Sequence, residues 1–509
     1  MNAVTIGEAA LDMETLVEIS RKGLPVRLSE KALARAIRAR ALVEKWVMEG
    51  RAVYGVTTGF GALSDVTIPG EDARTLQENI LMSHAAGVGA PLPEEVIRAT
   101  MVVRLQDLAQ GYSGIRAETL SALADLLNSG IYPLVPEKGS VGASGDLAPM
   151  AHLALVLIGQ GEAYHRGQCM PGREALAVAG LQPVQLEAGE GLALINGTQV
   201  MTAVTALAVH DAVRLSRTAD VACALSLEVL MGTNAEFDRR IHRVRPHPGQ
   251  AAAADNMFRI VQDSAIISSH EDCSRIQDAY TLRCSPQIHG ASKDALGHVR
   301  QVVETEMNAS TTNPLIFADT GDFLLGGNFH GQPVALAADY LCMALAELAN
   351  VSERRIERLV NPQLSGLPAF LVEKSGLNSG FMIAQYTAAA LVSENKPLCH
   401  PASVDSIPTS ANKEDHVSMG TISARKARAV LENTENVLAI ELLCGCQALD
   451  LLTHGRPGLG TQQAYRAVRE KVSRLDRDRP LSPDIRAITE LIKSGEIIRR
   501  VEAAVGPLN

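Results

Sequence analysis

The chain has 509 residues, of which 46% are hydrophobic, with a formal net charge of −10 and an isoelectric point near 5.8. A chain of this length can bury a large hydrophobic core, and its acidic balance argues against nucleic acid or an anionic membrane as a partner. The longest apolar stretch, around residues 151–159, is too short to span a bilayer, and Glu8, Asp12 and Glu14 stand where a signal peptide would be basic and then apolar. We therefore expect a cytoplasmic protein.

The eight cysteines are scattered, most of them in apolar segments such as residues 221–225. This distribution is typical of buried thiols in a reducing compartment. Cys444 and Cys446 are too close together for the usual Cys-x-x-Cys spacing, and no histidine pair with metal-ligand spacing stands near them. We predict no metal site.

The N-terminal third combines one clear helix with irregular segments. Ser29 is a candidate N-cap for a helix that ends near Gly50. The glycine-rich segment over residues 54–61 predicts an irregular loop, and short turns continue to about residue 145. We therefore expect a loop-rich, mixed part over residues 1–200.

Three later runs contain neither glycine nor proline: residues 198–231, 334–361 and 421–444. At ~1.5 Å per residue they would form helices of roughly 35–50 Å, the scale of a long bundle. Their apolar residues recur at helical spacing around much of the circumference, which favours helices buried in a bundle or an oligomer. We predict a mainly α protein in which a long helical bundle over residues 201–509 packs with the N-terminal part as one body, without a linker.

The run Gly-Ser-Val-Gly-Ala-Ser-Gly-Asp-Leu-Ala-Pro over residues 139–149 has the composition needed to turn backbone into an electrophile. If the Gly145 amide nitrogen reaches the carbonyl carbon of Ala143, a five-membered ring can close, and loss of two waters converts Ser144 into a dehydroalanine. The product is a 4-methylidene-imidazol-5-one (MIO). Gly145 has no Cβ to block the closure, and Ala143 is nearly as small. Because no ordinary side chain is a good electrophile, an enzyme that activates an amine as a leaving group needs such a group.

Two other interpretations of this run stay open at this point. An isolated Ala-Ser-Gly is usually only a turn. Asp146 could also cap a helix over residues 147–159, whose N-terminal N–H groups would then be available to a phosphate. However, the run lacks the Lys-Ser/Thr ending of a P-loop and does not match the dinucleotide pattern G-x-G-x-x-G.

Together with six other segments, this run makes the chain resemble the histidine ammonia-lyases, within the wider family of aromatic amino acid lyases and aminomutases. The resemblance extends from about residue 50 to 480, and it is carried in order by residues 54–61, 81–87, 139–149, 191–198, 277–284, 326–330 and 410–419. It implies non-oxidative elimination of ammonia from L-histidine to give trans-urocanate, through an MIO formed from Ala143, Ser144 and Gly145 without an external cofactor. It also implies a homotetramer whose active sites each take residues from three chains.

The resemblance further assigns roles at the reacting end of the substrate. Tyr54 matches the family base that removes the β-proton, which a tyrosine can do only when ionised, a state favoured by nearby positive charge. Arg283 resembles the carboxylate anchor, because a guanidinium fork binds a carboxylate through two hydrogen bonds. Tyr280 matches a residue near the electrophile, and Gln277 would share the face of Tyr280 and Arg283 if this segment is helical.

Four further residues are expected around the substrate. Asn196 would contact the substrate or the imidazolone oxygen, which gains negative charge during the reaction, and Phe329 would line the pocket. His84 follows the pattern of histidine and tyrosine lyases. Glu414 matches an acid of the histidine enzymes, and its carboxylate could accept a hydrogen bond from an imidazole N–H. We therefore predict L-histidine as the substrate.

Three departures from the histidine pattern keep other substrates open. Residues 57–59 read Thr-Thr-Gly as in phenylalanine lyases, Ala279 replaces a proline, and Lys413 replaces a glutamine. Lys413 either pairs with Glu414 or points away, and neighbouring residues on a helix diverge by about 100°. The alternatives are a tyrosine or phenylalanine ammonia-lyase, an aromatic amino acid 2,3-aminomutase and, more remotely, an inactive helical scaffold. Against the last stand the intact residues Tyr54 and Ser144.

Overall fold

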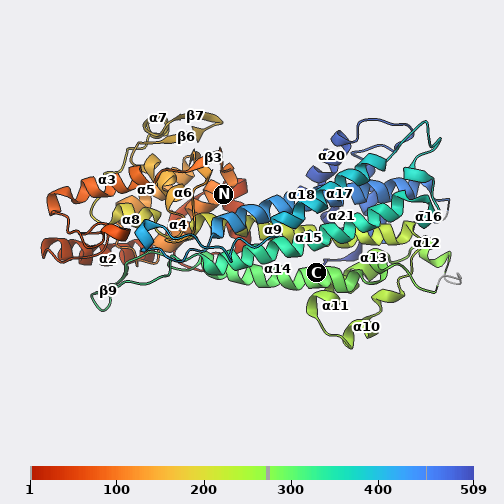
Figure 1. Ribbon diagram of the computed structural model, residues 1–509, viewed down its shortest axis with the longest axis horizontal. Coiled ribbons are helices and arrows are strands. Elements are labelled where there is room, and N and C mark those ends of the chain that lie inside the picture. The colour runs from red at the N-terminus through yellow and green to blue at the C-terminus, as the bar shows by residue number, and fades with distance from the viewer. Residues whose placement is uncertain (1–2, 271–275, 454) are drawn as a thin grey trace. The chain divides into compact units, whose positions relative to one another are not determined.

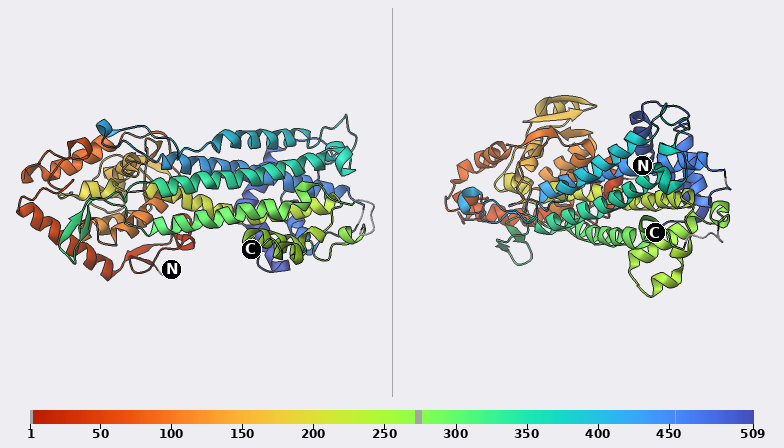
Figure 2. Two further views of the ribbon diagram at one scale, coloured as in Figure 1. Left: turned by 60° about the horizontal axis from the view of Figure 1, so that its bottom comes forward. Right: turned by 45° about the vertical axis from the view of Figure 1, so that its right-hand side comes forward.

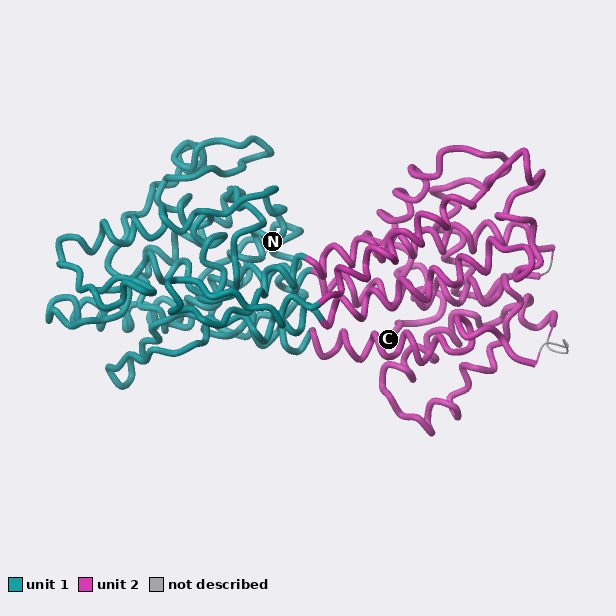
Figure 3. Tube along the Cα trace, in the orientation of Figure 1, with its two compact units in different colours: residues 1–207, 300–339, 401–425 teal, residues 208–299, 340–400, 426–509 magenta. Residues whose placement is uncertain are grey.

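The computed structural model describes residues 3–270, 276–453 and 455–509. Helices dominate the described chain, and only short sheets accompany them (Figure 1). This confirms the prediction of a mainly helical protein. The chain forms two compact units: the first contains residues 1–207, 300–339 and 401–425, and the second contains residues 208–299, 340–400 and 426–509 (Figure 3). The predicted parts 1–200 and 201–509 describe a change of sequence character along the chain and stay a prediction.

The first unit holds all the described strands. They form a parallel pair β1–β2, antiparallel pairs β3–β5 and β8–β9, and an antiparallel three-stranded sheet in the order β4-β6-β7. The strands are β1 (Val4–Ile6), β2 (Val26–Leu28), β3 (Val88–Pro91), β4 (Ile131–Pro133), β5 (Pro136–Lys138), β6 (Glu162–His165), β7 (Gln168–Pro171), β8 (Leu315–Phe317) and β9 (Asp322–Leu324).

The helices of the first unit surround a core that includes α4 (Glu94–Leu108), which is buried over most of its length. The predicted N-cap Ser29 is confirmed, because its hydroxyl accepts a hydrogen bond from the Ala32 N–H at 3.0 Å. The other helices are α1 (Met13–Lys22), α2 (Glu30–Met48), α3 (Ala73–His84), α5 (Ala117–Asn128), α6 (Leu147–Leu157), α7 (Gly172–Val178), α8 (Glu190–Ile195) and the 3₁₀ turns η1 (Gly61–Leu63), η2 (Gly70–Asp72) and η5 (Ser410–Asn412).

The division between the units falls within four long helices: α9 (Gln199–Val229), α14 (Ser285–Met307), α15 (Gln332–Val360) and α18 (Gly420–Leu451). Three of them match the runs without glycine and proline. The third run was expected to stop at Cys444, but α18 continues through Gly445. A Cβ at this position would lie 2.9 Å from the Leu225 side chain, so glycine lets α9 and α18 pack closely in the second unit.

In the second unit these helices lie side by side, and hydrogen bonds such as Ser226 Oγ to Glu441 Oε1 and Ser292 Oγ to the Ala344 carbonyl connect them (Figure 2). Shorter elements complete the unit: η3 (Ala235–Phe237), α10 (Arg239–Arg243), α11 (Pro248–Ile260), α12 (Ala265–Ser268), α13 (Tyr280–Arg283), α16 (Pro362–Ser365), η4 (Ala369–Leu371), α17 (Met382–Leu398), α19 (Leu459–Arg469), α20 (Ser482–Lys493) and α21 (Glu496–Val505).

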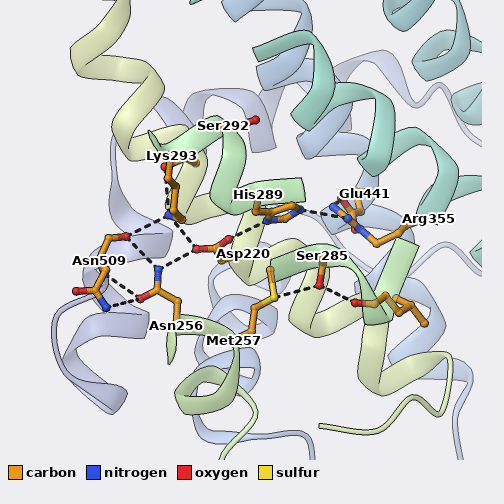
Figure 4. A network of polar contacts seen from close by, with 12 residues as sticks. Asp220, Asn256, Met257, Ser285, His289, Ser292, Lys293, Arg355, Glu441 and Asn509 are labelled. Carbon is orange, nitrogen blue, oxygen red and sulfur yellow. Dashed lines mark hydrogen bonds and ion pairs between the residues drawn. The ribbon is translucent and has the colours of Figure 1, made fainter. Parts of the chain in front are cut away.

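A buried polar network joins the long helices of the second unit (Figure 4). The Arg355 guanidinium donates to both carboxylate oxygens of Glu441, at 2.5 and 2.9 Å, and its third nitrogen lies 3.3 Å from His289 Nε2. His289 Nδ1 lies 2.8 Å from an oxygen of Asp220, which also pairs with Lys293 at 3.0 Å. This arrangement requires a neutral imidazole with its proton on Nδ1, and burial lowers the pKa of His289 accordingly.

One helix corrects an expectation about apolar stretches. The segment around residues 151–159 was expected to be the longest, but α15 (Gln332–Val360) is long and apolar enough to cross a membrane by length and composition. However, 67% of its most apolar window is buried inside the protein. A helix buried in a protein core can have the same apolar composition as a membrane span, so the composition of α15 does not distinguish the two.

Glu228, near the end of α9, makes stability depend on pH. Its side chain is buried, one oxygen accepts from the Gly458 N–H at 2.7 Å, and the other has no hydrogen-bond partner among the described residues. Burial raises the pKa of Glu228 to about 7. A folded-state pKa above the unfolded value means that Glu228 destabilises the fold increasingly as pH rises from about 4.5 to about 7.

We therefore expect Glu228→Gln, which keeps an acceptor for Gly458 but cannot ionise, to be within about 1 kcal/mol of the wild type in stability at pH 5 and more stable at pH 8 by about 3 kcal/mol. Urea denaturation midpoints of both proteins at the two pH values check this. An equal loss of stability between pH 5 and pH 8 in the variant and the wild type would contradict it.

Candidate functional site

A pocket of about 740 Å³ in the first unit brings together five of the residues predicted for the site: Tyr54, His84, Ser144, Asn196 and Glu414. Most of the remaining wall is apolar: Phe60, Ala62, Leu63, Val66, Ile68, Leu76, Ile80, Leu147, Leu192 and Ala411. None of the described lining residues is an arginine or a lysine. A concave, mainly apolar pocket with a few convergent polar groups is typical of a site for a small molecule.

The loop over residues 139–149 is held by a close backbone contact. The Asp146 N–H donates to the Gly197 carbonyl at 2.7 Å, and Gly145 and Gly197 form an isolated parallel bridge. Gly145 has a φ of +72°, and a Cβ at this position would collide with the Gly197 carbonyl oxygen. Both the dihedral angle and the lack of space therefore require glycine at position 145.

The Asp146 side chain does not cap a helix, the possibility that the sequence left open. The helix α6 does begin at Leu147, but it ends at Leu157, and the Asp146 side chain makes no capping hydrogen bond. Its buried carboxylate accepts instead from the hydroxyls of Ser140 and Thr421 and from the Met201 N–H at 2.8 Å. It thereby fastens the loop to the first turns of α9 and α18. Burial raises the pKa of Asp146, and a buried acid at this helix start is unsuited to a phosphate site.

Ser144 is the polar residue of this loop that lines the pocket. Its hydroxyl donates to Glu414 Oε1 at 2.9 Å, and its carbonyl accepts from Asn196 Nδ2 at 3.2 Å. Asn196 is buried at the end of α8, and its Oδ1 has no hydrogen-bond partner among the described residues. The hydroxyl and the carbonyl of Ser144 are therefore both hydrogen-bonded. The Asn196 Oδ1 beside them is a buried acceptor without a partner among the described residues.

Glu414 is oriented from its other side by Thr409, whose hydroxyl donates to Oε2 at 2.6 Å. The backbone groups of the same two residues also pair, at 3.0 and 3.3 Å. The neighbouring Lys413 is exposed, and in the part of the chain that the structure describes it forms no ion pair with Glu414. Of the two alternatives for Lys413, the pairing with Glu414 is therefore not the one found.

Tyr54 and His84 stand on other parts of the same pocket wall. The Tyr54 hydroxyl accepts from the Gly61 N–H at 3.1 Å, and its ring packs edge-to-face on Phe60 with centroids 6.4 Å apart. His84 ends α3, and its Nδ1 lies 3.1 Å from the Ser83 hydroxyl. Burial lowers the pKa of His84, and the opposing effect of the Glu414 charge is smaller. His84 is therefore neutral at pH 7, so each ring nitrogen has a distinct donor or acceptor role.

Three predicted residues belong to the second unit. Tyr280 and Arg283 form the ends of α13, and the guanidinium carbon lies 5.4 Å from the centre of the tyrosine ring, so they share one face as expected. Gln277 precedes the helix, which begins only at Tyr280, and so is not on a helical stripe with them. A carbonyl of this short helix, that of Thr281, lies 3.5 Å from a nitrogen of Arg355. The buried network therefore also contacts the turn that presents Tyr280 and Arg283.

Phe329 belongs to the first unit, in the segment of the chain that connects β9 to α15. It is half-buried and is not among the residues that line the pocket. Conversely, the site includes two candidates that the sequence analysis did not name: Thr409, which contacts Glu414, and Phe60, which lines the pocket. Thr409 gave no signal, because a hydroxyl five residues before an acid is common. Phe60 stood inside the recognised loop over residues 54–61, and its aromatic character was the available signal.

Gly145 allows a direct test of the loop geometry. Gly145→Ala combines a left-handed dihedral angle with a collision against Gly197, whereas Gly167 has a similar φ of +79° with no other atom near its Cβ position. We expect Gly167→Ala to lower the free energy of unfolding by about 1 kcal/mol, the cost of the dihedral angle alone. Gly145→Ala should lower it by several times as much. Chemical denaturation measures both, and equal losses would show that the Gly197 contact does not constrain the loop.

Comparison with known proteins places this geometry in context. A model of the family described as aromatic amino acid lyase matches residues 11–470. The histidine ammonia-lyase of Alkaliphilus oremlandii is 55% identical over 505 residues, which cover 99% of each chain. A solved structure of histidine ammonia-lyase from Trypanosoma cruzi has a TM-score of 0.92 at 44% identity, and the match covers 99% of this chain and 96% of the Trypanosoma cruzi chain. A tyrosine aminomutase from Streptomyces globisporus has a TM-score of 0.94 at 36% identity and covers 100% of both chains.

Proposed function

Because the chain belongs to the aromatic amino acid lyase family, we propose that it eliminates ammonia from L-histidine without oxidation and releases trans-urocanate. The observation that carries this proposal is the contact between Ser144 and Glu414. It sets the residue expected to form the electrophile against the carboxylate expected to bind the imidazole. The 55% identity with a histidine ammonia-lyase over the full chain supports this substrate.

We further propose that Ala143, Ser144 and Gly145 form a methylidene-imidazolone. The Gly145 nitrogen would bond to the Ala143 carbonyl carbon, and the Ala143 oxygen and the Ser144 hydroxyl would leave as two waters. The residues fit this group. The contact with Gly197 leaves no room for a side chain on Gly145, whose nitrogen would close the ring. Asn196 donates a hydrogen bond to the Ser144 carbonyl oxygen, which the ring would keep. When formed, the ring would supply an electrophilic methylene that takes up the substrate amine.

The side chains around it have separable roles. The Asn196 amide donates to the Ser144 oxygen and so stabilises negative charge that develops there. The Tyr54 oxygen, held by the Gly61 N–H, would accept the β-proton of the substrate. Loss of the Ser144 hydroxyl would free Glu414 Oε1 to accept from the imidazole N–H. The apolar side chains of the wall would limit the access of water to the reacting atoms.

The carboxylate anchor has to come from outside the pocket wall, since its described lining includes no cation. We propose that Arg283, with Tyr280 and Gln277, reaches the site from a neighbouring copy of the chain in a homotetramer, and that Phe329 also contributes through this assembly. In support, Tyr280 is 73% exposed on the second unit although it is a large aromatic residue. A guanidinium fork presented beside it suits the α-carboxylate of an amino acid.

A tyrosine or phenylalanine ammonia-lyase, or an aromatic 2,3-aminomutase, is the second candidate. The 36% identity with a tyrosine aminomutase over the whole chain favours it, as do Thr57 and Thr58. Glu414 favours histidine as the substrate, because a phenyl ring has no hydrogen-bond donor for the Glu414 carboxylate. An inactive scaffold is disfavoured by the intact grip on Ser144.

Incubation of the purified protein with L-histidine, L-tyrosine or L-phenylalanine tests the substrate. The ultraviolet absorbance of the conjugated acids should rise only with histidine, or at least tenfold faster than with the others, because of the hydrogen bond that Glu414 offers. Cinnamate or coumarate without urocanate would refute the proposed function. A β-amino acid detected by mass spectrometry would instead identify an aminomutase.

Sharing of active sites between copies is tested with two inactive variants. Ser144→Ala removes the electrophile precursor and Arg283→Ala the carboxylate anchor, so each variant alone should lose at least 99% of activity, in line with ~10² or more for a single catalytic group. Co-expression with two different affinity tags, followed by purification on both, should restore a measurable fraction of wild-type turnover. No recovery in assemblies that contain both variants would contradict shared sites.

A further inference from the structure

We propose that Thr409 is a positioning residue that holds the Glu414 carboxylate toward the substrate ring and thereby helps to select histidine. This inference rests on the proposed function, because it acts through Glu414. Two hydroxyls donate to this carboxylate, Ser144 Oγ to Oε1 at 2.9 Å and Thr409 Oγ1 to Oε2 at 2.6 Å. A carboxylate held at both oxygens has a fixed plane and a fixed rotamer, and short hydrogen bonds to a charged group are among the strong ones.

The two hydroxyls have different fates in the proposed reaction. Ring formation removes the Ser144 hydroxyl, so Oε1 becomes available to the imidazole N–H of the substrate. The Thr409 hydroxyl keeps its place on Oε2. Among the described residues, it is then the remaining side-chain donor to Glu414, and it stops the carboxylate from rotating away from the ring of the substrate.

Backbone hydrogen bonds also fix the distance between Thr409 and Glu414. The Thr409 N–H donates to the Glu414 carbonyl at 3.0 Å, and the Glu414 N–H donates back at 3.3 Å. The loop closed by this pair contains Ser410, Ala411 and Asn412, three consecutive non-glycine residues with φ values of 50°, 52° and 65°. Left-handed backbone of this kind persists only where its surroundings enforce it, and such strain is concentrated at functional sites. The Thr409–Glu414 pair provides this enforcement at the ends of the loop.

The same loop also contacts the segment that carries the proposed base. The Ser410 hydroxyl accepts from the Ala62 N–H at 3.3 Å, and a Cβ at Gly61 would lie 2.6 Å from that hydroxyl oxygen. The Gly61 N–H in turn donates to the Tyr54 hydroxyl. The end of the pocket that recognises the ring and the end that removes the proton are therefore connected through neighbouring turns, η5 and η1. A shift of the loop at Thr409 would therefore displace both Glu414 and the turn that holds the Tyr54 hydroxyl.

Three substitutions separate the hydroxyl of Thr409 from its bulk. Thr409→Val keeps the shape and removes the donor, so KM for L-histidine should rise about tenfold, the equivalent of one such hydrogen bond, while kcat changes less than threefold. Thr409→Ser keeps the donor and should restore KM to within threefold of the wild type. Thr409→Ala also removes the donor without adding volume and should raise KM as Thr409→Val does. Thr320→Val serves as the control, because the exposed Thr320 hydroxyl donates to the Phe317 carbonyl and to no other group among the described residues.

A double-mutant cycle with Glu414→Gln distinguishes action through Glu414 from a general structural effect. If Thr409 acts through the carboxylate, Thr409→Val should lower kcat/KM for histidine at least three times less in the Glu414→Gln background than in the wild type. Equal effects in both backgrounds, or a wild-type KM for Thr409→Val and Thr409→Ala, would overturn the inference. A Glu414→Gln variant with wild-type kinetics would instead refute the role of Glu414 in the proposed function.

Discussion

The close approach of the Gly145 and Gly197 backbones is the constraint on which the pocket depends. No Cβ fits between them, and the Asp146 N–H completes the contact by donating to the Gly197 carbonyl. With this side of the loop fixed, the hydroxyl and carbonyl of Ser144 meet Glu414 and Asn196 on the side of the pocket. A side chain at Gly145 would collide with Gly197 and move the serine away from Glu414 and Asn196. The proposed ring formation therefore requires first that residue 145 has no side chain.

Buried carboxyl groups provide the fastenings behind this constraint. Asp146 gathers donors from its own loop, from α9 and from α18, and Asp107 on α4 does the same with the side chains of Arg104, Gln199 and Ser310. Burial raises the pKa of both acids, so their hydrogen bonds have to offset a desolvation cost. Removing one partner leaves the others unsatisfied, which makes these groups sensitive points in the fold. In the second unit Glu441 and Asp220 tie the long helices in the same manner.

Local patterns predicted the elements that depend on local forces. Helical periodicity and the lack of glycine and proline identified α9, α15 and most of α18, because these properties act within one helix. The continuation of α18 through Gly445 could not be predicted, since it depends on contact with Leu225 in another helix. The same holds in the site: Ser144 and Glu414 were recognisable within motifs, whereas the sequence left open a capping role for Asp146 that its side chain does not have. Two of the groups that donate to its carboxylate, the Met201 N–H and the Thr421 hydroxyl, are remote in the sequence.

Everything in the proposed function leads back to the backbone of Ala143, Ser144 and Gly145. The most direct measurement is the mass of the intact purified chain, followed by the mass of the peptide that contains residues 139–149. The account predicts an intact mass lower than that of the sequence by two waters, with the whole difference located in this peptide. An enzymatically active chain with the unmodified mass would contradict it, because the three residues would then have remained an ordinary loop.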